Sequence, residues 1–354
     1  MISSQLIKWY KQNARDLPWR NSSDPYKIWL SEIILQQTRV AQGLPYYQKF
    51  TETFPTVFDL AKAPEQKVLK LWQGLGYYSR ARNLHHAAKQ IVKEYNGAFP
   101  NEFSEIKKLK GVGDYTASAI ASFCFNKPHA VVDGNVYRVL SRLFAIKTPI
   151  DSTEGKKEFA ELANELIDKK NPGTYNQAIM EFGAMYCTPA NPDCANCVLR
   201  EKCLSGPKGK ATLFPVKSLK TKIRTRYFEY FFITQKQTSF LQKRTEKDIW
   251  QNLYQFPLLE FSENPSKQVV MNRFQKEILK LSSKSEIKKV FPHKKHQLSH
   301  QTILARFWHI NAPEAKLSAV YKPINIKNIK KYPFPVLLSN YLDEITIFEK
   351  KHNP

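Results

Sequence analysis

The sequence lacks the long apolar segments that mark membrane-spanning or secreted proteins. No stretch of its 354 residues approaches the ~18 consecutive apolar residues that a membrane helix needs. Residues 1–20 interleave charged side chains with Trp9 and Tyr10 and contain no uninterrupted apolar run, unlike a secretory signal. Internal repeats and low-complexity tracts are also missing. We therefore expect a cytoplasmic protein that has no membrane partner.

Acidic residues are scarce relative to basic ones. The chain has 31 Asp and Glu against 55 Lys and Arg, which gives a formal net charge of +24 at pH 7. A positive electrostatic field of this size favours a polyanionic partner such as nucleic acid, because basic side chains that neutralise phosphates release the counterions condensed around them. A merely basic solvated surface or an anionic membrane would also fit the charge. Nucleic acid is the favoured partner.

Cysteines are few, and four of the five lie within seventeen residues. A disulfide scaffold would spread them over a small secreted domain, so this clustering favours a metal or cluster site in a reducing compartment. The spacing C-x6-C-x2-C-x5-C satisfies either a tetrahedral zinc or an iron–sulfur cluster, and generic chemistry leaves that choice open. The candidate ligands are Cys187, Cys194, Cys197 and Cys203.

The first 200 or so residues show no alternation of strand-like and helix-like segments, and their pattern predicts an all-α domain. Apolar residues recur there at helical spacing. Seven prolines, at positions 45, 55, 64, 100, 128, 149 and 172, fall between the apolar runs, where helix breakers belong. We predict helices in residues 28–40, 68–71, 84–92, 116–125, 136–144 and 159–167.

The residue composition and the apolar pattern of the sequence change after Cys203. Residues 205–210 are small, polar and basic, which suits an exposed linker. Beyond them, residues 226–234, 239–242 and 303–310 are strand-like, and the last run alternates side chains between two faces. Residues 269–281 read as an amphipathic helix. A second, smaller α+β domain is therefore predicted.

A tight Gly-x-Gly turn separates two helical runs at Gly111-Val112-Gly113. Glycines let the backbone approach a ligand closely, and the helix that follows begins with unpaired amides, which can bind a phosphate. Taken alone the motif is weak, because many turns between helices use glycine for packing.

Two carboxylates stand out against apolar surroundings. Glu32 lies beside Ile33 and Ile34, so burial could raise its pKa and suit it to donate a proton near neutrality. By composition alone, an exposed Glu on a polar stripe is the alternative. Asp133 follows the apolar pair at residues 131–132, and its alternative role, the N-cap of the next helix, is compatible with catalysis.

Together these motifs resemble the endonuclease III superfamily of DNA glycosylases, and within it the MutY family of adenine DNA glycosylases. The cysteine spacing matches the superfamily's [4Fe–4S] loop, and the glycine turn, which precedes it, matches the helix–hairpin–helix. Segments 17–20, 30–40, 74–80 and 132–136 resemble the adenine-specific family, and the similarity covers essentially the whole chain. The resemblance implies a mainly α helix–hairpin–helix glycosylase domain with a [4Fe–4S] cluster (residues 1–204), a linker (205–224) and a smaller α+β Nudix-like domain (225–350).

The resemblance also assigns roles to residues. It implies that Glu32 protonates adenine at N7 and that Asp133 stabilises the sugar cation before water attacks C1′. Glycosylases that also nick the strand carry a lysine just after the second hairpin glycine, where this chain has Tyr115, so we expect base hydrolysis without strand cleavage. The adenine pocket would be lined by Trp19, Arg20, Leu35, Val40, Tyr115 and Gln177.

Lesion and mismatch recognition follow from the same resemblance. The implied substrate is duplex DNA in which adenine lies opposite 8-oxoguanine or guanine, bound by a monomer. Ser299 and His300 match a short loop that binds the lesion. Leu75, Tyr77 and Gln37 match residues that fill the gap in the duplex and contact the unpaired base, although Tyr77 and its neighbour Tyr78 could instead be core aromatics. No Nudix hydrolase box is present, because residues 250–260 lack a run of glutamates to hold magnesium. The DNA-contacting residues would be Gln37, Thr38, Leu75, Tyr77, Gly111, Gly113, Asn135, Ser299 and His300.

Two other functions fit part of the sequence. An endonuclease III-like pyrimidine glycosylase with lyase activity would share the hairpin and the cysteines, but Tyr115 and the second domain argue against it. A non-enzymatic DNA-binding scaffold would share the charge and the hairpin. It would have no need for Glu32 together with Asp133.

Overall fold

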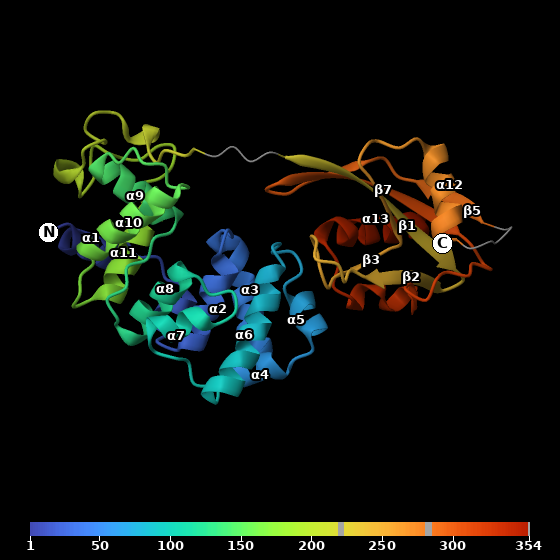
Figure 1. Cartoon of the computed structure of the whole chain (residues 1–354), viewed down its shortest axis with the longest axis horizontal. Coiled ribbons are helices and arrows are strands. Elements are labelled where there is room, and N and C mark those ends of the chain that lie inside the picture. Colours follow the sequence, from blue (N-terminus) through green and yellow to red (C-terminus); the bar gives the residue numbers. More distant parts are fainter. Residues whose placement is uncertain (219–222, 280–284, 353–354) are drawn as a thin grey trace. The chain divides into compact units, whose positions relative to one another are not determined.

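The computed structural model describes residues 1–218, 223–279 and 285–352. The chain divides into two compact units, Met1–Ala63 with Asn83–Leu219 and Pro64–Arg82 with Lys220–Pro354. In Figure 1 the part coloured blue to green is helical, and the part coloured yellow to red combines a sheet with helices such as α12 and α13. The helical first part and the α+β second part agree with the predicted fold class. The predicted linker includes residues 219–222, which lie outside the described residues. In the described part, no helix combines the length and the hydropathy needed to cross a membrane.

The first unit is built from helices with short connections. Asp24 caps the helix at Pro25, Thr56 forms a capping box with Asp59, and Ser152 caps the helix at Thr153, so local polar side chains set several of the starts. Its elements are α1 (Ile2–Asn13), η1 (Pro18–Asn21), α2 (Pro25–Leu35), α3 (Val40–Thr53), α4 (Val57–Lys62), most of α6 (Ser79–Tyr95), α7 (Phe103–Lys108), α8 (Asp114–Phe125), α9 (Gly134–Phe144), α10 (Thr153–Leu166), α11 (Pro172–Met185), η2 (Arg200–Lys202) and η3 (Ala211–Leu213).

One predicted helix is interrupted. The sequence predicts a continuous helix over residues 28–40, but α2 ends at Leu35 and α3 begins at Val40. Gln37 has a φ of 54°, a left-handed conformation that no α-helix can contain. Pro45, which we placed between helices, lies inside α3, where Tyr47 and Phe50 are buried. The burial of α3 therefore outweighs the backbone hydrogen bond that the proline removes.

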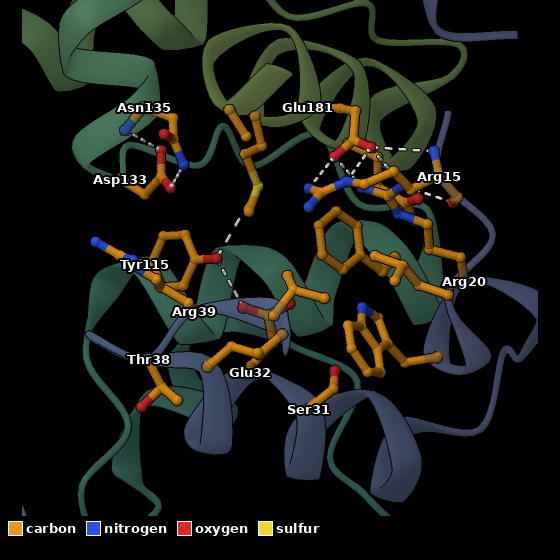
Figure 2. Close-up of a pocket in the computed structure, with 18 of the residues that line it drawn as sticks. Arg15, Arg20, Ser31, Glu32, Thr38, Arg39, Tyr115, Asp133, Asn135 and Glu181 are labelled. Carbon is orange, nitrogen blue, oxygen red and sulfur yellow. Dashed lines mark hydrogen bonds and ion pairs between the residues drawn. The ribbon is translucent and has the colours of Figure 1, made fainter. Parts of the chain in front are cut away.

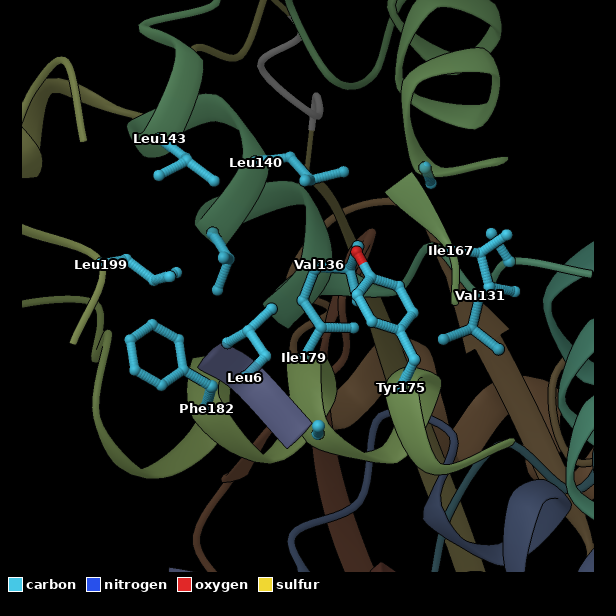
Figure 3. Close-up of a cluster of buried hydrophobic side chains, with 14 of the residues drawn as sticks. Leu6, Val131, Val136, Leu140, Leu143, Ile167, Tyr175, Ile179, Phe182 and Leu199 are labelled. Atoms are coloured by element: carbon cyan, nitrogen blue, oxygen red, sulfur yellow. The ribbon is translucent and has the colours of Figure 1, made fainter. Parts of the chain in front are cut away.

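The main core of the first unit lies between α1, α9 and α11. Leu6 from α1, Leu140 from α9 and Phe182 from α11 are at most 2% exposed and belong to one apolar cluster (Figure 3). Leu199, at the edge of the cysteine segment, joins the same cluster. The core thus connects α9, the helix that Asp133 caps, to the loop that carries the cysteines.

The second unit contains a mixed sheet in which a parallel pair is central. Strands β1 and β7 pair in parallel from Arg224 opposite Gln301 to Thr234 opposite Asn311, within the order β3-β2-β1-β7-β5. The described elements are α5 (Glu65–Leu71), β1 (Arg224–Gln235), β2 (Thr238–Lys243), β3 (Tyr254–Gln255), β4 (Leu258–Phe261), α12 (Lys267–Glu277), β5 (Glu286–Val290), β6 (Lys294–Gln297), β7 (Gln301–Asn311), β8 (Lys322–Asn325), η4 (Ile326–Lys331) and α13 (Val336–His352).

Strand β7 is buried on both faces. Helix α12 covers the face that carries Trp308, while Tyr341 of α13 stacks on Phe307 from the other side at 4.1 Å between ring centroids. A strand between two helical layers needs apolar residues at successive positions, because neither face meets water. Helix α12 ends at Glu277, before the predicted limit, and residues 280 and 281 of the prediction lie outside the described residues.

The second unit also includes a short segment from the first half of the chain. Residues 64–82 contain α5 and the loop at Tyr77, and they group with the C-terminal residues. The side chain of Gln73 accepts a hydrogen bond from the backbone N–H of Phe334 at 3.2 Å and donates one to Ser339 Oγ at 2.9 Å. The Tyr78 hydroxyl donates to the Phe334 carbonyl at 3.2 Å. These bonds hold the loop that contains Tyr77 against the C-terminal elements.

Candidate active site

A pocket of about 480 Å³ lies in the first unit (Figure 2). Its walls come from η1, α2, the first residue of α3, α8, α9 and α11, so segments far apart in the sequence converge on it. The structure brings together here ten of the residues predicted from sequence, namely Trp19, Arg20, Glu32, Leu35, Thr38, Val40, Tyr115, Asp133, Asn135 and Gln177.

Glu32 is a buried carboxyl in the wall of this pocket. Its residue is only 8% exposed, so the alternative of an exposed glutamate on a polar stripe is excluded. The Tyr115 hydroxyl donates to Glu32 Oε2 at 2.7 Å from the first turn of α8. Burial raises the pKa of Glu32 to about 7, against the smaller lowering effect of the Tyr115 hydrogen bond. A carboxyl with this pKa can hold and release a proton near neutral pH.

Asp133 caps α9 and also lines the pocket. Its Oδ1 accepts from the backbone N–H groups of Asn135 at 2.9 Å and Val136 at 2.8 Å, as predicted for an N-cap. Burial raises the pKa of Asp133, while these backbone and side-chain hydrogen bonds oppose the shift. The carboxyl is therefore fixed in orientation, and both predicted roles are compatible in one geometry (Figure 2).

A second buried carboxylate stands on the opposite side of the pocket. Glu181 is 1% exposed and receives two-pronged hydrogen bonds from Arg15 and Arg20, at 2.6 to 3.0 Å. Burial alone would raise its pKa, but the hydrogen bonds from the two guanidinium groups outweigh burial and lower it to about 2. Glu181 thus stays ionised and holds Arg20 in the wall of the pocket.

Gln177 has its amide orientation set by a neighbour outside the pocket lining. The Tyr10 hydroxyl donates to Gln177 Oε1 at 2.5 Å. The Arg20 guanidinium carbon lies 5.4 Å from the centroid of the Tyr10 ring, a cation–π contact. Because Oε1 accepts from Tyr10, the orientation of the Gln177 amide group is defined.

The hairpin has the geometry expected of the motif. Helix α7 ends at Lys108 and α8 begins at Asp114. Gly111 has a φ of 80°, and a Cβ atom there would lie 2.6 Å from the Cβ of Asn83, so only glycine fits. Gly113 caps α8 with no side-chain hydrogen bond, which leaves the first amides of the helix free to bind an anion.

The four clustered cysteines line one small cavity. Hydrogen-bond donors approach their sulfurs: Arg142 Nη1 lies 3.4 Å from Cys187 Sγ, and the Gly206 amide lies 3.3 Å from Cys203 Sγ. Within the ranges that the structure describes, no three His, Cys, Asp or Glu side chains are grouped closely enough to hold a metal ion. Arg138 connects this loop to the active site, donating to the Cys187 carbonyl at 2.8 Å and to Asn135 Oδ1 at 2.8 Å.

The remaining predicted DNA contacts lie elsewhere. Gln37 is exposed at the end of α2. A separate pocket of about 400 Å³ within the second unit is lined by Leu75, Tyr77, Ser299 and His300. Tyr77 is 48% exposed and has a φ of 45°, whereas the adjacent Tyr78 is buried, so only Tyr78 is a core aromatic.

Comparison with known proteins agrees with this geometry. Residues 30–168 match the HhH-GPD superfamily of base excision DNA repair proteins, and residues 229–344 match the NUDIX domain. An adenine DNA glycosylase of Buchnera aphidicola subsp. Baizongia pistaciae is 34% identical over 352 residues, which cover 98% of this chain and 97% of the relative. Another, from Buchnera aphidicola subsp. Acyrthosiphon pisum, is 37% identical over 74% of this chain and 75% of its own length. This chain belongs to the adenine DNA glycosylase family.

Solved structures show the same helical fold. A thermostable thymine-DNA glycosylase superposes with a TM-score of 0.54 at 30% identity, covering 58% of this chain and 95% of that one. An endonuclease III bound non-covalently to DNA superposes with a TM-score of 0.51 at 23% identity, covering 59% of this chain and 94% of that one. The active-site elements of this adenine DNA glycosylase family member thus lie in a helical scaffold that other DNA glycosylases share.

Sequence reasoning missed three residues that shape the site in this family member. Glu181 could have been found by the signal that identified Glu32, because both are acids within apolar helical runs. Arg15 and Tyr10 carried no such signal: each is half-buried, and each acts through a partner more than 160 positions along the chain. Pairing at that separation cannot be inferred from local sequence.

Proposed function

We propose that this protein hydrolyses the N-glycosidic bond of adenine in duplex DNA where adenine lies opposite 8-oxoguanine or guanine. The observation that carries the proposal is the buried Glu32 carboxyl with its pKa near 7, in a pocket that also holds the fixed Asp133 carboxyl. The net charge of +24 supports binding to a polyanion.

The two carboxyls divide the chemistry between them. Adenine is a poor leaving group, so protonated Glu32 would donate its proton to N7 while the C1′–N9 bond breaks. Asp133, held by the amides of Asn135 and Val136, would stabilise the positive charge that develops on the sugar. Water then adds to C1′ and loses a proton. The products are free adenine and an abasic site in an intact strand.

Tyr115 supports hydrolysis without strand cleavage. A lyase needs an amine at this position to form a Schiff base with the sugar, and a phenol cannot replace it. The Tyr115 hydroxyl is instead bonded to Glu32. We therefore favour this function over an endonuclease III-like lyase, and borohydride should trap little covalent DNA complex.

The pocket in the second unit is proposed to read the opposite base. Extruding a base from the stack costs about a few kcal/mol, and an exposed ring such as Tyr77 can fill the gap that is left. Ser299 and His300, which line the same pocket, offer hydrogen-bonding groups to the lesion.

We also propose that the cysteine segment holds one [4Fe–4S] cluster. The four thiols line one cavity, and the amide and guanidinium donors near the sulfurs would offset the charge of the thiolates. Four thiolates can also hold a zinc ion, so the choice of a cluster is what the resemblance of the cysteine spacing implies. When bound, the cluster would serve as a structural crosslink that keeps basic residues such as Arg200 and Lys202 in place. Absorbance near 400 nm, and its loss with Cys203→Ser, would test this assignment.

One set of assays tests the function as a whole. The full-length protein would be given duplexes with adenine opposite 8-oxoguanine, guanine and thymine under single-turnover conditions. We expect excision opposite the first two and little opposite thymine. Replacing Ser299 and His300 together by alanine should reduce the preference for 8-oxoguanine over guanine. Excision of pyrimidines, or strand cleavage without added base, would contradict the proposal.

A further inference from the structure

The stretch of chain that leads to Asp133 is buried but has no regular secondary structure. Residues 126–133 connect α8 to α9. Ala130 and Val131 are 8% and 1% exposed, and the side chain of Val131 belongs to the main core of the first unit (Figure 3). Buried backbone N–H and C=O groups need hydrogen-bond partners. Where the backbone is irregular, side chains have to supply many of these partners.

Asn176 of α11 supplies two of them. Its residue is 0% exposed. Its Oδ1 accepts a hydrogen bond from the backbone N–H of Val131 at 3.2 Å, and its Nδ2 donates one to the carbonyl oxygen of His129 at 2.8 Å. One side-chain amide thus bonds backbone groups two residues apart, as a residue on a paired strand can. These bonds fix the path of the backbone just before Asp133.

The same amide also reaches α8. Nδ2 donates to Ser122 Oγ at 2.9 Å, and Ser122 is buried. Gly173, one turn before Asn176, lets the two helices come close, because a Cβ atom there would lie 2.7 Å from the carbonyl oxygen of Ser122. Helix α8 carries Tyr115, the partner of Glu32, in its first turn. Asn176 therefore ties residues 129–131 to the helix that orients the acid.

The bonds of Asn176 all lead away from its own helix. Asparagine is a poor helix former, and a buried amide costs free energy unless its polar atoms are bonded. Its three side-chain hydrogen bonds go to α8 and to the segment before Asp133, and both contribute walls of the active-site pocket. The next residue on α11, Gln177, lines the same pocket. The amide thus lies where three walls of the pocket meet.

We infer that Asn176 is a positioning residue that holds the Asp133 carboxylate at the sugar of the extruded nucleotide. The inference rests on the proposed function, in which Asp133 stabilises positive charge on the sugar. The amides of Asn135 and Val136 fix this carboxylate relative to α9 alone. Asn176 fixes the chain on the other side of Asp133. Misplacing a catalytic group by about 1 Å can cost about 10²-fold in rate, so a loose backbone at this point should impair catalysis.

Binding of a charged sugar analogue measures the placement of Asp133 without any reaction. A duplex with a pyrrolidine in place of the target sugar carries a positive charge there, whereas the matching tetrahydrofuran duplex is neutral. We expect the native protein to bind the pyrrolidine duplex more tightly, as measured by fluorescence anisotropy. Asn176→Leu keeps the size of the side chain but loses the amide, and should reduce this preference about tenfold. Affinity for the tetrahydrofuran duplex should change little.

A double-mutant cycle separates positioning from general stability. In an Asp133→Asn background, Asn176→Leu should leave the ratio of the two affinities unchanged, because no carboxylate remains to be misplaced. Tyr26→Phe is the matched control. It removes another buried hydrogen bond of the first unit, from the Tyr26 hydroxyl to the Phe54 carbonyl at 2.7 Å, and should keep the native ratio.

Hydrogen exchange tests the contact in the native protein, and so remains informative if Asn176→Leu fails to fold. The backbone amide of Val131 lies outside any helix or strand but is bonded to a buried side chain. It should therefore exchange with solvent as slowly as the amides in the middle of α8. Rapid exchange at Val131 would overturn the inference.

The outcomes distinguish the inference from the proposed function. A native preference for the pyrrolidine duplex that Asn176→Leu leaves intact overturns the inference, while the proposed role of Asp133 stands. An equal loss of preference with Tyr26→Phe, or a further loss in the Asp133→Asn background, assigns the effect to stability and also overturns it. If the native protein does not prefer the charged analogue, the proposed role of Asp133 fails, and the inference fails with it.

Discussion

The hydroxyl of Tyr115 lies 2.7 Å from Oε2 of Glu32 and donates a hydrogen bond to it. This bond joins the first turn of α8, directly after the hairpin glycines, to the carboxyl on α2. It stabilises the ionised form of Glu32 and so acts against burial, which stabilises the protonated form. Burial is the larger effect, and Tyr115 moderates it.

Replacing the acid should separate binding from catalysis. Glu32→Gln keeps the shape of the side chain but cannot donate a proton to the leaving base. We expect single-turnover excision of adenine to slow by about 10²–10⁴-fold, the usual contribution of general acid catalysis. Affinity for the duplex, measured by fluorescence anisotropy, should change little. Substantial excision by the variant would remove Glu32 from its proposed role.

The pH dependence of excision should follow the protonation of Glu32. The acid is active when protonated, so the rate should fall as pH rises through its pKa of about 7. Tyr115→Phe removes the hydrogen bond that lowers this pKa, and the alkaline fall in rate should therefore move to higher pH. Single-turnover rates between pH 5.5 and 9 would measure the shift. Residual activity of Glu32→Gln should lack this fall, and a fall that Tyr115→Phe leaves unmoved would contradict the assignment.

The sequence predicted the parts of the site whose signals are local. The hairpin glycines, the cap at Asp133 and an acid within an apolar run at Glu32 can each be read from a few neighbouring residues. The break after Leu35 could not, because the apolar residues keep their helical spacing up to Val40, although Gln37 has a left-handed φ of 54°.

Contacts between segments far apart in the chain also could not be predicted from the sequence. The alternating pattern of β7 predicts two faces, but it does not identify α12 and α13 as the helices that cover them. Gln73 carries nothing in its neighbourhood that would pair it with Phe334, 261 positions away. The periodicity and composition of a segment show which of its residues are apolar. Which helix or strand covers those residues depends on the topology of the whole chain.

Tyr10 should contribute to the choice of base without touching it. Its hydroxyl fixes the orientation of the Gln177 amide, whose residue lines the pocket. Adenine and hypoxanthine present opposite donor and acceptor patterns at N1 and position 6. A fixed amide accepts only one pattern, and one that can flip accepts both. We expect Tyr10→Phe to reduce the discrimination between adenine and hypoxanthine about five- to tenfold, by competition assay. Tyr137→Phe, outside the pocket lining, should leave the ratio unchanged.

The ion pairs at Glu181 should be a stability determinant that weakens in acid. Glu181→Gln leaves Arg15 and Arg20 without their carboxylate, and breaking a buried ion pair costs about 3 kcal/mol. The pKa of Glu181 is about 2 in the folded chain against an ordinary 4.5, so this stabilisation is complete above pH 4.5 and is lost as pH falls toward 2. Urea denaturation should therefore show a gap between native and variant proteins that is constant near pH 7 and narrows below pH 4.5. The exposed control Glu165→Gln should unfold like the native protein at neutral pH, and an equal gap at pH 7 and pH 3 would show that Glu181 acts through packing instead of charge.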